Sequence, residues 1–264
     1  MTIGLSLAAG GVKGFSHIAT LNFLEENNIK VDIITGSSAG AIVAALYGLY
    51  GNSKIVYKKF SNAVEKFFPN LKIYTEKLEK SNLWSIFQRA LVPIDEYYKF
   101  FKYLFERKKF SDLKYKIGIV TFDTLDGNSL LITEGFLVDA VMASSSVPGV
   151  FSPLWIAGTQ NTDGGVLSPS PINEAIKLGA DFVIASTFER KPKTFPKDQL
   201  ELMYYIDTWK EIEIEYVDLE KANVVIYYRI PYHWYQFHLY KEIYESSIKF
   251  LKERREEFDH RFWW

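Results

Sequence analysis

The chain contains no cysteine, which excludes disulfide bonds, thiolate nucleophiles and cysteine-ligated metal sites. It also lacks an excess of either charge, because 31 Lys and Arg against 32 Asp and Glu leave a net charge of −1. A protein with this charge has no general attraction to nucleic acid or to an anionic membrane. We therefore expect no nucleic-acid partner.

Long apolar runs are missing as well. No stretch of the sequence approaches the ~20 apolar residues that a membrane-spanning helix needs. The first apolar run follows no basic segment and is too short for a secretory signal. We expect a cytoplasmic protein with at most transient contact with a membrane surface.

The overall composition is that of a soluble globular protein, with 48% hydrophobic and 24% charged residues among 264. There is no internal repeat and no low-complexity linker. We predict a single domain over residues 1–264, with the core motifs in 3–190. A helical insertion is expected at about 53–109, and a helical, aromatic-rich part at about 198–264.

The first fifty residues alternate between strand-like and helix-like patterns. A strand at 2–7 runs into a glycine-rich turn and a helix that ends at Glu26, and a second strand at 31–34 precedes a helix at 39–50. This rhythm predicts a parallel sheet with helices on its faces. The expected fold class is therefore α/β, with three layers and a mainly parallel central sheet.

Further along the chain, short apolar runs and turn residues predict additional elements. These are a hairpin at 117–133, a helix at 135–145, a hairpin at 154–161, buried strands at 182–186 and 224–227, and a closing helix at 239–258.

Ser38 lies between Gly36 and Gly40 in a Gly-x-Ser-x-Gly sequence, the pattern of a nucleophile elbow. There a strand turns abruptly into a helix and leaves the serine hydroxyl exposed. Glycines are needed on both sides because a Cβ atom would collide with the neighbouring strand and helix. A structural turn without chemistry fits the five residues equally well, but the apolar run before them and the Ala-rich helix after them favour the elbow.

The glycine turn at residues 9–14 offers backbone N–H groups of Gly10 and Gly11. A dinucleotide-binding loop is a weak alternative, because its first glycine is replaced by Ala9 and the nearby acid, Asp32, begins the next strand instead of ending it. A tight turn without a ligand is a stronger alternative. Parallel strands nevertheless place such turns at one edge of the sheet, so Gly10, Gly11 and Ser38 are expected to be neighbours.

Asp163 precedes Gly164 and Gly165 after the second hairpin. Most Asp-Gly pairs are plain turns, but a serine nucleophile requires a base. The histidines are poorly placed for this role. His17 lies within the first helix, and the others occur in the aromatic C-terminal part outside any recognisable turn motif: His233, His238 and His260.

Four segments in this order make the sequence similar to the patatin-like phospholipases: residues 9–14, 36–40, 143–153 and 163–165. The resemblance implies a lipid acyl hydrolase of the phospholipase A, lysophospholipase or carboxylesterase type. Its substrates would be phospholipids or other fatty acyl esters, and it would need no metal or cofactor.

The resemblance also implies roles for individual residues. Ser38 would attack the ester and form an acyl-enzyme, and Asp163 would take its proton without a histidine. Gly10 and Gly11 would donate N–H bonds to the oxyanion, and Lys13 and Gly14 would belong to the same oxyanion or substrate-binding site. Lys13, before Gly14, stands where the family carries Arg or Lys, whereas Ala9 departs from the family's usual glycine.

Two other functions remain open from the sequence. A Ser–His–Asp esterase would place His233 or His238 near Ser38. A lipid-binding protein of the same fold would have no turnover.

Two aromatic segments each have two interpretations. Residues 95–109 mix aromatic and basic side chains at helical spacing, which fits a lid or membrane-facing helix or, more simply, an amphipathic helix packed on the core. Residues 261–264 would be either a terminal plug or an interfacial anchor.

Overall fold

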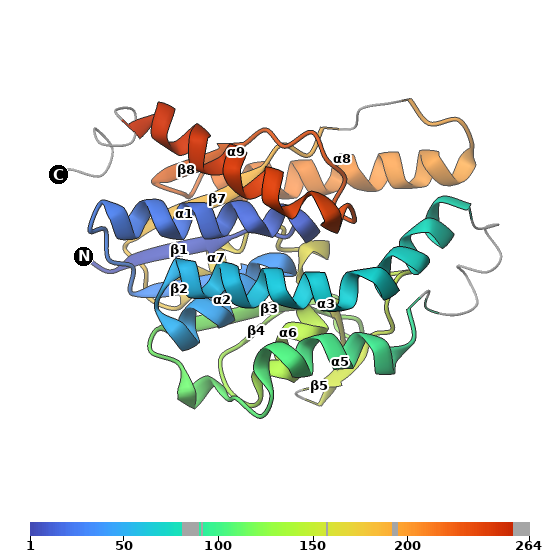
Figure 1. Ribbon diagram of the computed structural model, residues 1–264, viewed down its shortest axis with the longest axis horizontal. Helices are drawn as coiled ribbons and strands as arrows, with labels where there is room; N and C mark the ends of the chain where they lie inside the picture. The colour runs from blue at the N-terminus through green and yellow to red at the C-terminus, as the bar shows by residue number, and fades with distance from the viewer. Residues whose placement is uncertain (81–89, 91, 157, 192–194, 256–264) are drawn as a thin grey trace.

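The computed structural model describes residues 1–80, 90, 92–156, 158–191 and 195–255 (Figure 1). Within these residues, eight strands form one sheet in the order β5-β6-β3-β2-β1-β7-β8, with β4 paired to β3. The strands are β1 (Ile3–Leu7), β2 (Ile33–Ser37), β3 (Lys116–Asp123), β4 (Asn128–Ile132), β5 (Leu154–Ile156), β6 (Thr159–Asp163), β7 (Phe182–Phe188) and β8 (Val224–Tyr228).

The sheet is parallel through its centre and antiparallel at one side. Strand β1 pairs in parallel with β2 and β7, and the parallel pairing continues from β2 to β3 and from β7 to β8. The pairs β3–β4, β3–β6 and β5–β6 are antiparallel. The predicted α/β class with a mainly parallel sheet is confirmed.

Helices cover both faces of the sheet. Helices α1, α3 and α9 pack on one another in front of it (Figure 1), while α7 packs on the other face against a separate small cluster of buried apolar residues. The helices are α1 (Phe15–Glu26), α2 (Ala39–Tyr50), α3 (Ser53–Lys80), α5 (Ile94–Phe105), α6 (Leu137–Ser144), α7 (Ile172–Lys177), α8 (Gln199–Leu219) and α9 (Tyr240–Glu253).

Both predicted hairpins are confirmed, as β3–β4 and β5–β6. The helix expected from Gly135 begins later, at Leu137, because Gly135 forms a turn with a φ of +91°. Helix α9 runs over Tyr240–Glu253, and the predicted end at Phe258 lies outside the described residues. Helix α7 was not predicted.

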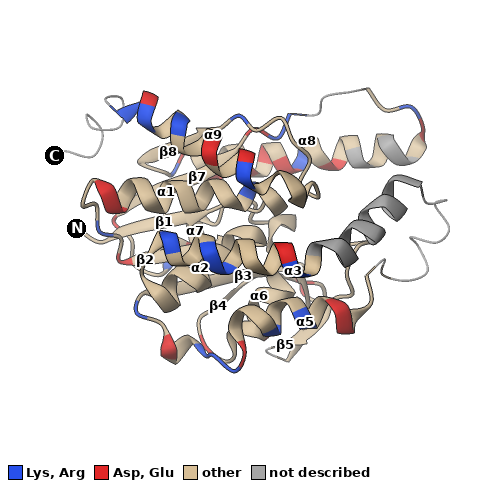
Figure 2. Ribbon diagram, in the orientation of Figure 1, with Lys and Arg blue, Asp and Glu red and all other residues tan. Residues whose placement is uncertain are grey.

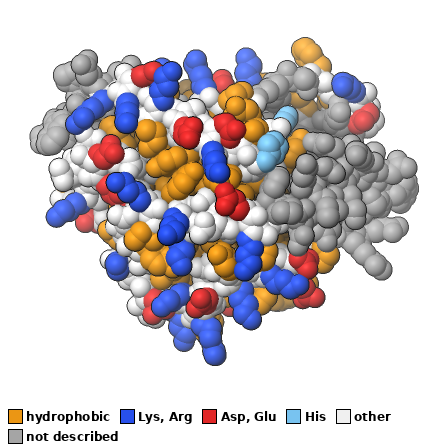
Figure 3. Space-filling model, in the orientation of Figure 1, with side chains coloured by type: hydrophobic (Ala, Val, Ile, Leu, Met, Phe, Trp, Pro, Cys, Tyr) orange, Lys and Arg blue, Asp and Glu red, His pale blue; other side chains and the backbone are white. Residues whose placement is uncertain are grey.

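Charged residues occur mainly on the helices and on peripheral loops, and few occur on the strands of the sheet (Figure 2). On the face seen in Figure 3, Lys and Arg alternate with Asp, Glu and hydrophobic side chains, so that face is not uniformly basic. In the part of the chain that the structure describes, none of the helices combines the length and the hydropathy needed to cross a bilayer.

Candidate active site

The two predicted turns meet at the carboxyl ends of β1 and β2. Gly10, Gly11 and Ser38 line one pocket of about 240 Å³, together with Asp163 and Gly165. The glycine turn and the elbow are therefore neighbours, as the parallel pairing of their strands requires.

Ser38 occupies a strained elbow between β2 and α2. Its φ of 53° and ψ of −117° belong to a region that residues with a Cβ rarely adopt. The elbow also presses closely against β1. A Cβ atom on Gly40 would lie 2.0 Å from the Leu7 carbonyl oxygen, and one on Gly36 would lie 2.4 Å from the backbone of Gly40. Glycine is therefore required at both positions.

Two serines at the end of α6 hold the backbone of Ser38. The Ser38 N–H donates to Ser144 Oγ at 3.0 Å, and that hydroxyl donates onward to the Val120 carbonyl oxygen at 2.5 Å. On the other side, Ser145 Oγ donates to the Ser38 carbonyl oxygen at 3.2 Å. The segment 143–153 was expected only as part of the family resemblance, and the structure shows that its first serines brace the elbow.

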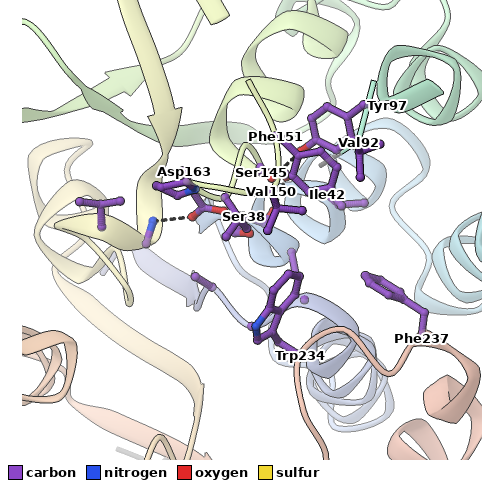
Figure 4. Close-up of a pocket in the computed structure, with 18 of the residues that line it drawn as sticks. Ser38, Ile42, Val92, Tyr97, Ser145, Val150, Phe151, Asp163, Trp234 and Phe237 are labelled. Carbon is purple, nitrogen blue, oxygen red and sulfur yellow. Dashed lines mark hydrogen bonds between the residues drawn. The ribbon is translucent and has the colours of Figure 1, made fainter. Parts of the chain in front are cut away.

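Asp163 ends β6 beside Ser38 (Figure 4). Its N–H donates to the Ser146 carbonyl oxygen at 3.1 Å, and its Oδ1 accepts from the Gly165 N–H at 2.8 Å. Its Oδ2 is buried and has no hydrogen-bond partner among the described residues.

Burial raises the pKa of Asp163 from 3.8 to about 7. The neighbouring Ser38 side chain and the Gly165 N–H counteract this by lowering the pKa, as does the positive charge of Arg190, whereas Glu211 raises it. A carboxylate with a pKa near neutrality is a far better proton acceptor than an ordinary aspartate.

The glycine turn contributes Gly10 and Gly11 to the lining of the pocket. Neither Gly10 N nor Gly11 N donates to any residue within the described ranges. Gly11 has a φ of +56°, and a Cβ there would lie 2.3 Å from the Trp234 carbonyl oxygen, which accepts from Val12 N at 2.8 Å. The Ala9 N–H instead donates to the Pro169 carbonyl oxygen at 2.8 Å. Of these three N–H groups, those of Gly10 and Gly11 therefore have no acceptor among the described residues.

Two further residues expected at the oxyanion or substrate-binding site, Lys13 and Gly14, lie outside the lining of the pocket. Gly14 and Gly164 instead serve packing. A Cβ on Gly14 would lie 2.8 Å from the Cβ of Ala39, and one on Gly164 would lie 2.1 Å from the Val120 carbonyl oxygen. These glycines let the turns approach their neighbours.

No histidine lines the pocket in the part of the chain described. His17 is buried, its two ring nitrogens hydrogen-bond to the Ala8 carbonyl oxygen and to Ser186 Oγ, each at 2.8 Å, and burial lowers its pKa to about 3. His233 and His238 are exposed, and His260 lies outside the described residues.

Helix α5 forms an apolar wall of the pocket. Its buried face includes Tyr97, Phe100 and Phe101, which line the cavity. The structure therefore favours the packed amphipathic helix over a helix turned towards a membrane. The other expected aromatic segment, residues 261–264, lies outside the described residues.

The lining residues that the sequence did not indicate include Arg190, Glu211, Trp234 and Phe237. Arg190 follows β7 in a segment without a motif, and Glu211 lies on α8. The aromatic content of the C-terminal part was the one available signal for Trp234 and Phe237.

The dinucleotide alternative is not supported. Asp32 Oδ2 accepts from the Ile3 N–H at 2.8 Å, which places this acid at the amino ends of the strands, opposite the pocket. Within the described ranges, no group of three or more His, Asp or Glu side chains could hold a metal ion.

Comparisons with known proteins agree with this architecture. The model of the patatin-like phospholipase family matches residues 5–176. The lysophospholipase NTE1 of Candida albicans is 26% identical over 95% of this chain and 20% of its own length. The NTE1 of Meyerozyma guilliermondii is 28% identical over 73% of this chain and 13% of its own.

Both relatives are thus much longer than this chain, which spans a fifth of their length or less. Among solved structures, VipD from Legionella pneumophila has a similar fold, with a TM-score of 0.50, 15% identity, and coverage of 93% of this chain and 67% of VipD. With the family match covering well over half of its residues, the chain belongs to the patatin-like phospholipase family.

Proposed function

We propose that this protein hydrolyses fatty acyl esters, with phospholipids or lysophospholipids as its substrates, through a catalytic dyad of Ser38 and Asp163. The observation that carries this proposal is the position of Ser38 beside an Asp163 carboxyl group whose Oδ2 has no partner among the described residues. The family membership and the lysophospholipase names of the relatives support the class of substrate.

In the first half-reaction, Ser38 Oγ attacks the ester carbonyl carbon while Asp163 Oδ2 accepts the hydroxyl proton. The negative charge that develops on the carbonyl oxygen is stabilised by the N–H groups of Gly10 and Gly11. Asp163 then returns the proton to the departing alcohol, and an acyl-enzyme remains.

In the second half-reaction, a water molecule attacks the acyl-enzyme and gives its proton to Asp163. The second tetrahedral intermediate collapses, the fatty acid leaves, and the proton returns to Ser38 Oγ. One water is consumed for each ester cleaved, and the enzyme is regenerated.

The apolar lining of the pocket fits a fatty acyl chain. Beyond Ser38 the cavity is walled almost entirely by hydrocarbon and aromatic side chains, which favour an apolar ligand. These residues are Ile42, Phe60, Val92, Tyr97, Phe100, Phe101, Val147, Val150 and Phe151.

The proposal is tested by measuring hydrolysis of p-nitrophenyl esters and of lysophosphatidylcholine by the wild type, Ser38→Ala and Asp163→Asn. We expect Ser38→Ala to reduce hydrolysis to background and Asp163→Asn to lower kcat by about 10²–10⁴. His233→Asn and His238→Asn, which alter exposed histidines, serve as controls and should retain wild-type rates.

Two results would contradict the dyad. Loss of activity in either histidine variant as complete as in Ser38→Ala would support the Ser–His–Asp alternative. A folded wild-type protein that neither hydrolyses these esters nor reacts with a fluorophosphonate would instead be a lipid-binding protein of the same fold.

A further inference from the structure

Arg190 makes two charged hydrogen bonds at the edge of the pocket. Its Nε donates to Glu215 Oε2 at 2.7 Å and its Nη2 donates to the Ala9 carbonyl oxygen at 2.6 Å. The side chains of Arg190 and Glu215 are only 14% and 5% exposed. A buried ion pair often contributes little net stability because both charges lose their hydration. Stability therefore does not explain the ion pair, and the contact with Ala9 suggests a role in function.

The Ala9 carbonyl and the Gly10 N–H belong to the same peptide group. Because that group is planar, a fixed carbonyl oxygen also fixes the direction of the N–H on its other side. A cationic donor at the oxygen further polarises the peptide, which makes its N–H a stronger donor. Arg190 can therefore act on the Gly10 N–H, the proposed oxyanion donor, without contacting the ester itself.

We propose that Arg190 is a positioning residue that aims and strengthens the Gly10 N–H as an oxyanion donor. This inference rests on the proposed function, since it assigns the origin of part of the transition-state stabilisation. It also gives a reason why the mostly buried Arg190 lines the same pocket as Ser38.

The surroundings hold Arg190 in place for this task. Glu215 Oε1 accepts from Ser170 Oγ and from Thr187 Oγ1, each at 2.5 Å, so the carboxylate that orients the guanidinium is itself fixed. On the opposite side of the same residue, the Ala9 N–H is fixed by the Pro169 carbonyl oxygen at 2.8 Å. Both peptide groups that flank Ala9 are thus held by a hydrogen bond.

Two other roles for Arg190 make different predictions. A direct contact with a substrate phosphate would change KM for phospholipids and leave neutral esters unaffected. A purely structural ion pair would lower the melting temperature without changing how the site treats an oxyanion. The test must therefore use a neutral ester and a readout specific for the oxyanion.

The principal variant is Arg190→Lys, which keeps the positive charge but replaces the planar fork by a single ammonium. A lysine cannot hold both Glu215 and the Ala9 oxygen in the same geometry. On a neutral p-nitrophenyl ester we expect kcat to fall about 10–100-fold, somewhat less than the loss of a whole oxyanion donor, with KM changed less than about twofold. Fluorophosphonate inactivation should slow in parallel.

The oxyanion-specific readout compares oxoesters with the corresponding thionoesters. Sulfur is a poor acceptor, so a well-aimed donor favours the oxoester, and the ratio of the two rates should fall in Arg190→Lys. Lys221→Met, which removes the Lys221–Asp218 ion pair outside the lining of the pocket, is the control and should keep the wild-type ratio.

A second variant, Arg190→Ala, distinguishes loss of the guanidinium group from misfolding, because added guanidinium can restore activity only to a folded protein. Arg190→Ala should regain part of its activity with millimolar guanidinium but not with ammonium. The inference is overturned if Arg190→Lys retains wild-type kcat, if its oxoester-to-thionoester ratio is unchanged, or if only KM for phospholipids rises. If Ser38→Ala remains active, the proposed function itself fails; if Ser38→Ala is inactive and Arg190→Lys is fully active, only this inference fails.

Discussion

The rings of Tyr97 and Phe151 stack nearly parallel, with their centroids 3.7 Å apart and an interplanar angle of 17°. Tyr97 comes from α5, and Phe151 from the segment whose serines brace Ser38. The Tyr97 hydroxyl also donates to the carbonyl oxygen of Ser145. This pair therefore joins the apolar wall of the pocket to the support of the nucleophile.

Phe151→Ala should shift the preferred acyl chain towards longer esters. Removing this ring enlarges the cavity. Longer chains then gain room to make contact with its wall, and short chains lose contact with it. The measurement is kcat/KM across a series of p-nitrophenyl esters, with Phe195→Ala as the control because Phe195 is 85% exposed. An unchanged chain-length profile would show that the acyl chain does not contact this wall.

Activity should depend on a single ionisation with a pKa near 7. Burial raises the pKa of Asp163 to about 7, and only the deprotonated carboxylate can take the Ser38 proton. For an uncharged ester, kcat/KM should therefore rise about tenfold per pH unit below this value and level off above it. A profile that is flat from about pH 5 to 9 would contradict Asp163 as the base.

Asp163→Asn should be more stable than the wild type at alkaline pH. Because the pKa of Asp163 is higher in the folded state than the ordinary 3.8, its contribution to stability is full below about pH 4 and is lost as the pH rises through about 7. Asparagine does not titrate, so the melting temperature of the variant should exceed that of the wild type by several degrees at about pH 8, at roughly 2–4 °C per kcal/mol.

The sign of this difference is diagnostic. The gap in melting temperature should shrink as the pH falls towards about 5, where the wild-type carboxyl is also protonated in the folded state. A variant that is less stable than the wild type at every pH would show that the buried carboxylate is stabilised by partners that asparagine cannot replace.

Gly40→Ala should destabilise the elbow severely. A Cβ at this position would meet the Leu7 carbonyl oxygen at 2.0 Å and the Ala8 carbonyl oxygen at 2.9 Å, and these backbone atoms leave little room to relax. We expect a loss of about 3 kcal/mol or more in the free energy of unfolding. Thermal or denaturant unfolding measures this directly.

Gly127→Ala provides the matched control for that loss. Gly127 has a φ of +69°, but a Cβ added there would have no neighbouring atom within 4 Å, so its substitution carries only the backbone strain of about 1–2 kcal/mol. Equal losses in the two variants would show that the close packing of the elbow on β1 is not what requires glycine.

The turns of the site were predictable because their chemistry is local. A strand, a glycine and an abrupt helix can be read within a few residues, and parallel pairing brings such turns to one edge. That logic placed Ser38 beside Gly10 and Gly11 from sequence, and the structure agrees. The family resemblance added Asp163.

The remaining parts of the site depend on long-range packing. Arg190 reaches Ala9 across 181 positions, and no short motif surrounds it. Helix α8 lies within the helical part expected at about 198–264, but its bounds were not predicted because its apolar residues do not define one buried side; Met203, Ile206 and Trp209 are exposed. The hydrogen bonds from Ser144 and Ser145 to Ser38 likewise become visible only when α6 is packed against the elbow.

The most direct test of the catalytic dyad is to map the site of fluorophosphonate labelling by mass spectrometry and to measure its rate in Asp163→Asn and in a His233→Asn/His238→Asn double variant. We expect one adduct, on Ser38, formed far more slowly in Asp163→Asn and at the wild-type rate in the double histidine variant. An adduct on another residue, or labelling that requires a histidine and not Asp163, would contradict the dyad.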